Sequence, residues 1–216
     1  MFRRVQIRFW QRRALNAFAT ADFVRARQAF ERLLVLAPRQ RGHRFNLGLV
    51  LLAEKDFAAA RASFLEEQQL HGDSLPLAKA LAETAYRTAD RQQARTHYAR
   101  CLGFEPTGKE RAFCAQRLAI CNDGQRFERA MTAQTLADRG DEMMGKKEFA
   151  AAAALFSESC SLDATHFQAL NNLGAIRLAQ KDYAGALESF RQADQLVDLP
   201  QIKKNLAYLA RQRVTA

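Results

Sequence analysis

Small and large hydrophobic residues recur along this chain with a period much longer than one helical turn. Between Phe167 and Pro200, a Leu-Gly pair is followed by a tyrosine, an alanine and a phenylalanine, at Gly174, Tyr183, Ala186 and Phe190. The same order recurs 34 residues earlier, at Gly140, Phe149, Ala152 and Phe156. Helical spacing within each stretch and the 34-residue period between stretches predict repeated pairs of α-helices.

Three further copies precede these two in a single register. They fill the four positions with Ala14, Phe23, Ala26 and Phe30, with Gly48, Phe57, Ala60 and Phe64, and with Ala82, Arg91, Ala94 and Tyr98. A glycine or alanine in the first helix lets the second helix approach closely, and aromatic side chains fill the space that remains. An acidic residue just before each second helix is expected to cap the helix N-terminus. These residues are Asp22, Asp56, Asp90, Glu148 and Asp182.

This pattern resembles the tetratricopeptide repeat (TPR) family, and Trp10 occupies the position of the family's tryptophan. The resemblance implies an all-α fold, a TPR-like helical solenoid in which antiparallel helix pairs form a right-handed superhelix. We predict an N-terminal block at 1–108, a degenerate helical linker at 109–132, two repeats at 133–200 and a C-terminal capping helix at 201–216. The repeats themselves are predicted at 7–40, 41–74, 75–108, 133–166 and 167–200.

The linker at 109–132 is ten residues short of a full repeat. Its first part predicts one helix that ends at an Asn-Asp-Gly breaker, after which a long helix can run from Gln125 to Gly145. A break in register weakens the contacts between neighbouring repeats, so we expect a bend or hinge here.

Positive charge is concentrated at the N-terminus. The chain has a net charge of +10, and residues 1–44 hold eleven arginines against Asp22 and Glu31. The first predicted helix carries Phe2, Val5 and Phe9 among these arginines. We favour the interpretation that its apolar flank packs on the second helix while its arginines are solvated. The alternative is a helix that lies on an anionic membrane or contacts nucleic acid.

The TPR resemblance also implies which residues line a partner-binding groove, because four positions of each first helix face it. In the first block these residues are Arg8, Gln11, Leu15, Phe18, Phe45, Leu49, Leu52, Lys79, Glu83 and Tyr86. In the second block they are Gln134, Asp141, Met144, Asn171, Ala175 and Leu178. Asn46 and Asn172 match the asparagine with which some TPR domains hold a C-terminal carboxylate, and we expect them to bond backbone groups. The cations of that clamp are missing, so we do not expect a chaperone-tail receptor.

Catalytic and metal-binding patterns are not found. The four cysteines form no CxxC pair, and we expect buried thiols rather than a zinc site. The histidines are expected near helix ends, with no Ser-His-Asp or Cys-His order. Gly103–Lys109 has P-loop spacing, but it follows a helix and places Glu110 where a hydroxyl should bind magnesium. We therefore predict no enzyme activity, no cofactor, no metal and no small-molecule substrate.

The sequence thus predicts a protein–protein interaction adaptor or scaffold that holds a peptide segment of another protein in its concave groove. One alternative is a TPR-type secretion chaperone that cradles an exported protein, and another is a basic protein that associates with anionic membrane or nucleic acid. No signal peptide or membrane span is recognised, and we expect a cytoplasmic location.

Overall fold

A computed structural model describes residues 2–211, and these residues form twelve α-helices and no strand. The all-α prediction is confirmed. The helices are α1 (Phe2–Ala19), α2 (Phe23–Leu36), α3 (His43–Ala53), α4 (Phe57–His71), α5 (Leu75–Arg87), α6 (Arg91–Gly103), α7 (Gly108–Asn122), α8 (Gly124–Gly145), α9 (Phe149–Leu162), α10 (Phe167–Ala179), α11 (Tyr183–Leu196) and α12 (Pro200–Arg211). They belong to two compact units, Met1–Phe104 and Glu105–Ala216, here called unit 1 and unit 2.

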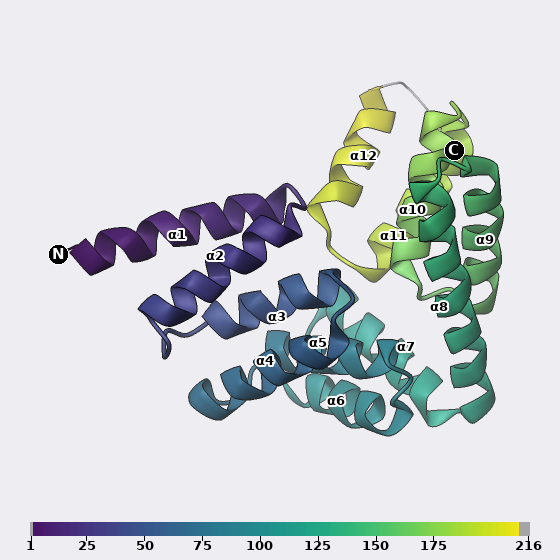
Figure 1. The fold of residues 1–216 in the computed structure, drawn as a ribbon. Helices are drawn as coiled ribbons and strands as arrows, with labels where there is room; N and C mark the ends of the chain where they lie inside the picture. The colour runs from purple at the N-terminus through teal and green to yellow at the C-terminus, as the bar shows by residue number, and fades with distance from the viewer. Residues whose placement is uncertain (1, 212–216) are drawn as a thin grey trace. The chain divides into compact units, whose positions relative to one another are not determined.

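Unit 1 contains three helix pairs, α1–α2, α3–α4 and α5–α6 (Figure 1). The repeat bounds 7–40, 41–74 and 75–108 stay a prediction. The second helix of one pair also packs against the first helix of the next, as α2 does on α3 and α4 on α5. The first two pairs therefore bury their apolar stripes both within the pair and against the next repeat of unit 1.

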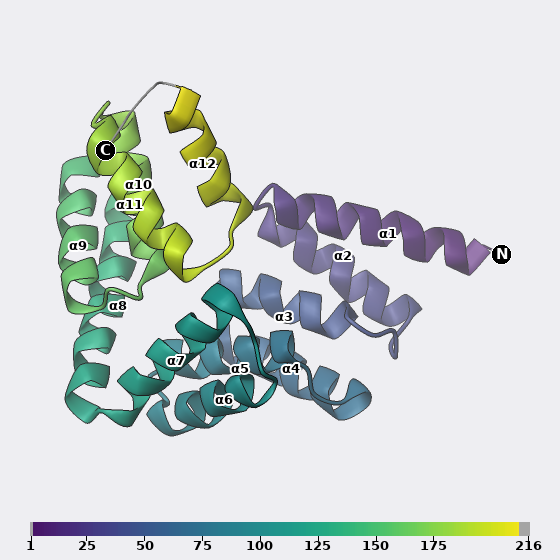
Figure 2. The same ribbon diagram turned by 180° about the vertical axis from the view of Figure 1, so that it is seen from behind.

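Unit 2 contains the pairs α8–α9 and α10–α11, with α12 packed against α11 (Figure 2). The long helix predicted from Gln125 to Gly145 is α8, which begins one residue earlier. The predicted linker at 109–132 supplies α7 and the first part of α8, and α7 contacts both α8 and α11. Whether this segment acts as a hinge stays a prediction.

Close approach within the pairs depends on the small residue predicted in each first helix. A Cβ atom added to Gly174 would lie 2.8 Å from the ring of Phe190, and one added to Gly140 would lie 2.7 Å from the ring of Phe156. Gly48 faces Phe64 in the same way. These distances are shorter than normal van der Waals contacts. The aromatic ring therefore occupies the space that a larger residue in the first helix would need.

The acidic residues predicted to cap the second helices do so in four of the five repeats. Asp22, Asp56, Asp90 and Asp182 each accept a hydrogen bond from the backbone N–H three residues on, at 3.0–3.1 Å. Glu148 occupies the same position before α9 but makes no capping hydrogen bond. Its side chain is one methylene longer than aspartate, so the capping prediction is wrong there while the favourable charge remains.

The residue before each of these caps has a left-handed backbone, although none is a glycine. The five residues are Ala21, Lys55, Ala89, Lys147 and Lys181, with φ between 57° and 65°. The turn within every repeat therefore uses the same left-handed backbone conformation, which costs free energy for any residue with a Cβ atom.

Candidate binding surfaces

The groove positions predicted on α1 lie at the surface of unit 1. Leu15 is 53% exposed and Phe18 is 36% exposed, and Arg8 is exposed beside them along the helix. Gln11 is half-buried, and its Nε2 lies 3.2 Å from the Nε2 of His43 on α3. Burial lowers the pKa of His43, so the ring is neutral near pH 7 and can accept from the Gln11 amide.

The groove positions predicted on α3 are only half exposed. Phe45, Leu49 and Leu52 pack against a core cluster. Asn46 is half-buried on the same helix. The cluster consists of Leu51, Ala60, Phe64, Leu77, Ala80 and Leu81. These α3 side chains therefore stabilise the fold with one side and leave the other side at the surface.

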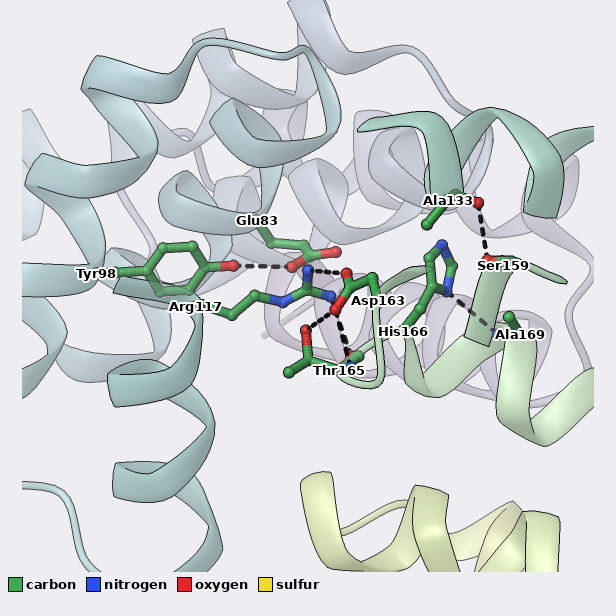
Figure 3. Close-up of polar contacts among 9 residues, drawn as sticks. All are labelled: Glu83, Tyr98, Arg117, Ala133, Ser159, Asp163, Thr165, His166 and Ala169. Carbon is green, nitrogen blue, oxygen red and sulfur yellow. Dashed lines mark hydrogen bonds and ion pairs between the residues drawn. The ribbon is translucent and has the colours of Figure 1, made fainter. Parts of the chain in front are cut away.

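On α5, two of the three predicted groove residues are half-buried and one is buried. Lys79 is half-buried, and Glu83 accepts a hydrogen bond from the hydroxyl of Tyr98 at 3.1 Å (Figure 3). Tyr86 is only 1% exposed, and its ring meets that of Tyr98 edge to face at 6.2 Å. The prediction that Tyr86 lines a groove is corrected, because its ring is used in packing.

In unit 2, the predicted polar residues bond to one another. The Nδ2 of Asn172 donates to the carboxylate of Asp141 at 3.0 Å, and the Nδ2 of Asn171 donates to Oδ1 of Asn172 at 3.3 Å. Both of these bonds are to side chains, and a bond from Asn172 to the backbone of a ligand stays a prediction. A carboxylate beside Asn172 also repels the peptide C-terminus that a carboxylate clamp would hold.

Sequence reasoning missed a buried ion pair between Arg117 on α7 and Asp163 in the α9–α10 turn (Figure 3). The Nη1 of Arg117 lies 2.8 Å from Oδ2 of Asp163, and Nη2 donates to the carbonyl oxygen of Thr165 at 3.1 Å. The other carboxylate oxygen of Asp163 accepts from the N–H and hydroxyl of Thr165, at 2.9 and 2.6 Å. The side chains of Arg117 and Asp163 are 2% and 1% exposed.

These partners decide the ionisation of Asp163. Burial alone raises the pKa of a carboxyl group, but the charge of Arg117 and the two hydrogen bonds from Thr165 outweigh it. The net effect holds the pKa of Asp163 below its ordinary value, so the group is ionised at neutral pH. This network fixes α7 to the α9–α10 turn, and α7 is further tied to α11 by Lys109 and Asp194 at 2.8 Å.

Two other buried side chains, Ser159 and His166, make hydrogen bonds to the backbone in unit 2 (Figure 3). The hydroxyl of Ser159 donates to the carbonyl oxygen of Ala133 at 2.8 Å, and Nδ1 of His166 accepts from the N–H of Ala169 at 3.2 Å. His166 is thus the cap of α10, near a helix end as predicted. His97, by contrast, lies in the middle of α6, where we had expected a helix end.

No metal site or membrane span is formed by the residues described. Within residues 2–211, no three His, Cys, Asp or Glu side chains come together as metal ligands would, and no helix is long and apolar enough to cross a bilayer. Cys101, Cys114 and Cys121 are buried, and Cys160 is half-buried. The P-loop-like stretch is the turn between α6 and α7.

Comparison with known proteins identifies the class. The family model for the tetratricopeptide repeat matches residues 12–74 and 137–198, more than half of the chain. The chain belongs to the tetratricopeptide repeat family, whose fold is typical of protein–protein interaction scaffolds without enzyme activity. No match was found among curated proteins.

Solved structures share the fold at low sequence identity. The TPR domain of P58(IPK) is 14% identical with a TM-score of 0.47, and the alignment covers 95% of this chain and 65% of that one. A tetratricopeptide repeat protein from Parabacteroides merdae is 13% identical with a TM-score of 0.50, over 95% and 99%. The APC/C hetero-tetramer Cut9–Hcn1 gives 10% identity and a TM-score of 0.51, over 94% and 42%. The chain thus spans less than two thirds of the length of the P58(IPK) domain and of the Cut9–Hcn1 chain.

Proposed function

We propose that the protein is an adaptor that binds a peptide segment of a partner protein along the first helices of unit 1. The observation that carries this proposal is the exposure of Leu15 and Phe18, two apolar side chains at groove positions of α1. Phe45, Leu49 and Leu52 extend the apolar character to α3. Exposed apolar side chains in a repeat protein favour a partner that buries them.

The charge around this face indicates the kind of segment it accepts. Arg8 lies among the groove positions of α1, and most of the positive charge of the chain falls within residues 1–44. A segment with apolar residues flanked by Asp or Glu would complement this surface, with the apolar contacts supplying affinity and the charges supplying orientation.

Charging Leu15 provides the test. A partner is first captured from native lysate, identified by mass spectrometry and purified, and its affinity is then measured by titration. We expect Leu15→Glu to weaken binding by at least tenfold while the circular dichroism spectrum is unchanged, because this side chain is largely exposed. Leu49→Glu should weaken binding too, but it also costs folding stability, because Leu49 packs on the core cluster.

Two control variants complete this test. Val35→Glu introduces the same charge at an exposed position of α2 outside the groove, so it should bind as the wild type does. Ala60→Glu places an unpaired charge in the core and should unfold the repeat stack. Unchanged affinity in Leu15→Glu would exclude the first-helix face as the binding surface.

A second candidate function is supported by the start of α1. Ile7 and Trp10 pack against the core, and Arg3 donates to the carbonyl oxygen of Leu36 at 2.9 Å, so part of the predicted packing is present. Phe2, Val5 and Phe9, however, are 77%, 61% and 57% exposed, which corrects our expectation that this apolar flank packs on α2. Exposed aromatic residues among arginines suit an anionic lipid surface.

Vesicle binding distinguishes this candidate from the adaptor. Attachment to an anionic membrane predicts sedimentation with phosphatidylserine-containing vesicles, no sedimentation with phosphatidylcholine vesicles, and a steep loss as salt rises. Phe2→Ser with Phe9→Ser should abolish it. Peptide binding to the apolar face should change little with salt, so the salt dependence separates the two functions.

A further inference from the structure

A small cavity opens in unit 1 where the start of α3, the end of α4 and the start of α5 meet. Its volume is about 180 Å³. That is below the roughly 300–1,000 Å³ of pockets that bind drug-sized ligands. Its lining includes Arg41, Phe45, Glu67, His71, Pro76 and Leu77. Its size suits one long side chain rather than a whole small molecule.

Glu67 is the unusual residue of this cavity. Its position in the repeat is occupied elsewhere by uncharged residues, at Leu33, Cys101, Ser159 and Ala193. Glu67 is only 5% exposed. Its Oε1 accepts from the backbone N–H of Gly42 at 2.6 Å, while its Oε2 is buried and has no hydrogen-bond partner. A buried carboxylate oxygen without a partner is costly, which favours a ligand that donates to it.

The surroundings of Glu67 restrict the chemistry of that ligand. Phe45 supplies an aromatic wall, and Pro76 and Leu77 supply apolar contacts suited to an aliphatic stem. The Nε2 of His71 is a second buried polar atom without a hydrogen-bond partner. One carboxylate and one imidazole are too few ligands for a metal ion, and a carboxylate repels anions. An organic cation fits both the charge and the aromatic wall.

We propose that this cavity binds the cationic side chain of a lysine or arginine in the partner segment, with Glu67 as its counter-ion. This inference rests on the proposed function and specifies the segment further. The same chemistry already occurs in unit 2, where the guanidinium of Arg117 meets the buried carboxylate of Asp163 and a backbone carbonyl. Arg41 also lines the cavity, from an exposed position.

A pair of small probes tests the cavity without knowledge of the partner. N-acetyl-arginine amide carries the cation, and N-acetyl-citrulline amide has nearly the same shape without the charge. Titrations are followed by ¹⁵N-labelled NMR of the full chain, through the backbone amide of Gly42 and the ring of His71. We expect weak, saturable shifts at both sites with the arginine probe and none with the citrulline probe. Equal shifts with both probes, or none, would overturn the proposal.

Variants of Glu67 assign the effect to its charge. Glu67→Gln keeps an acceptor for the N–H of Gly42 but removes the charge. It should weaken the binding of the arginine probe by at least tenfold. Glu67→Ala places a small residue here, as Ala193 does in the last repeat, and should also abolish binding of the arginine probe. If one of the two variants fails to fold, the other still tests the role of Glu67. Glu66→Gln alters the exposed neighbour that pairs with Arg44 and should leave probe binding unchanged. Unaltered probe binding in folded Glu67→Gln would refute the assignment.

The probe and partner assays can fail separately. If Leu15→Glu leaves partner binding intact while the arginine probe still binds, the groove is wrong and the cavity remains a cation site. If Leu15→Glu disrupts partner binding while the arginine probe gives no shifts, the proposed function stands and the cavity is excluded.

Discussion

The buried pair of Arg117 and Asp163 allows the energetics of unit 2 to be tested with a double-mutant cycle. Asp163→Asn can keep its one side-chain oxygen for both hydrogen bonds from Thr165, and its amide NH2 then faces the guanidinium in place of the second carboxylate oxygen. Arg117→Met removes the cation while keeping an apolar stem next to Phe113, over whose ring the guanidinium lies at 5.3 Å. Each single change leaves one charge buried without its partner.

The expected magnitudes follow from that burial. Loss of one partner from a buried ion pair costs about 3–5 kcal/mol, whereas replacement of both partners can be close to neutral. We expect each single variant to lose about 3 kcal/mol of unfolding free energy and the double variant to lose about 1–2 kcal/mol. The interaction energy between the two sites is then several kcal/mol, since the single losses would add to about 6 kcal/mol if they were independent.

Urea unfolding followed by circular dichroism at 222 nm measures these differences. With a slope of about 1–3 kcal/mol per molar urea, a loss of 3 kcal/mol lowers the midpoint by about 1–3 M. Hydrogen exchange of peptides from α7 and from the α9–α10 turn assigns the loss to unit 2. Single variants that each lose less than about 1 kcal/mol, with a double variant equal to their sum, would refute the reasoning.

Three further predictions follow from the described contacts. Because the pKa of Asp163 is lowered in the folded state, the ionised group stabilises the fold above its ordinary pKa near 3.8, and this contribution is lost as pH falls through the folded pKa. The unfolding free energy of Asp163→Asn should therefore fall less steeply with decreasing pH than that of the wild type. Burial and the nearby Asp163 raise the pKa of the Cys160 thiol to about 12, so iodoacetamide at pH 8 should modify Cys160 only in urea, as mass spectrometry can check. Gly174→Ala should destabilise the fold by about 1–2 kcal/mol, because the overlap of its added Cβ with Phe190 costs more than the helix-propensity gain of about 1 kcal/mol. Thermal melts measure this loss, and Gly145→Ala, whose added Cβ has no atom near it, should show none.

Much of the fold could be predicted because it depends on local patterns. The Asp22 cap needs only a carboxylate placed three residues before a backbone N–H, and the contact of Gly174 with Phe190 lies within one repeat. Glu148 shows the limit of this reasoning, since the position was right and the reach of the side chain decided the outcome. Repetition revealed these contacts because several copies share them.

The surfaces were harder to predict, because they depend on how one side chain packs rather than on its position in a repeat. Tyr86 occupies a groove position, yet its ring turns to Tyr98. Arg117 and Asp163 lie 46 residues apart, and Arg117 belongs to the truncated segment that has no register to compare. Glu67 could have been noticed as a charged residue where other repeats are uncharged, but its buried, unpartnered oxygen is visible only in the structure.

The attachments of α7 bear on how the protein can be divided. Repeat boundaries suggest a fragment that begins at residue 133, but such a fragment would lack Arg117 and would leave Asp163 with an uncompensated charge. It would also lack Lys109, the partner of Asp194, and the ring of Phe113 that meets Phe167 at 6.0 Å. A C-terminal fragment that keeps these contacts therefore begins in the turn after α6, near Glu105, and includes the incomplete repeat.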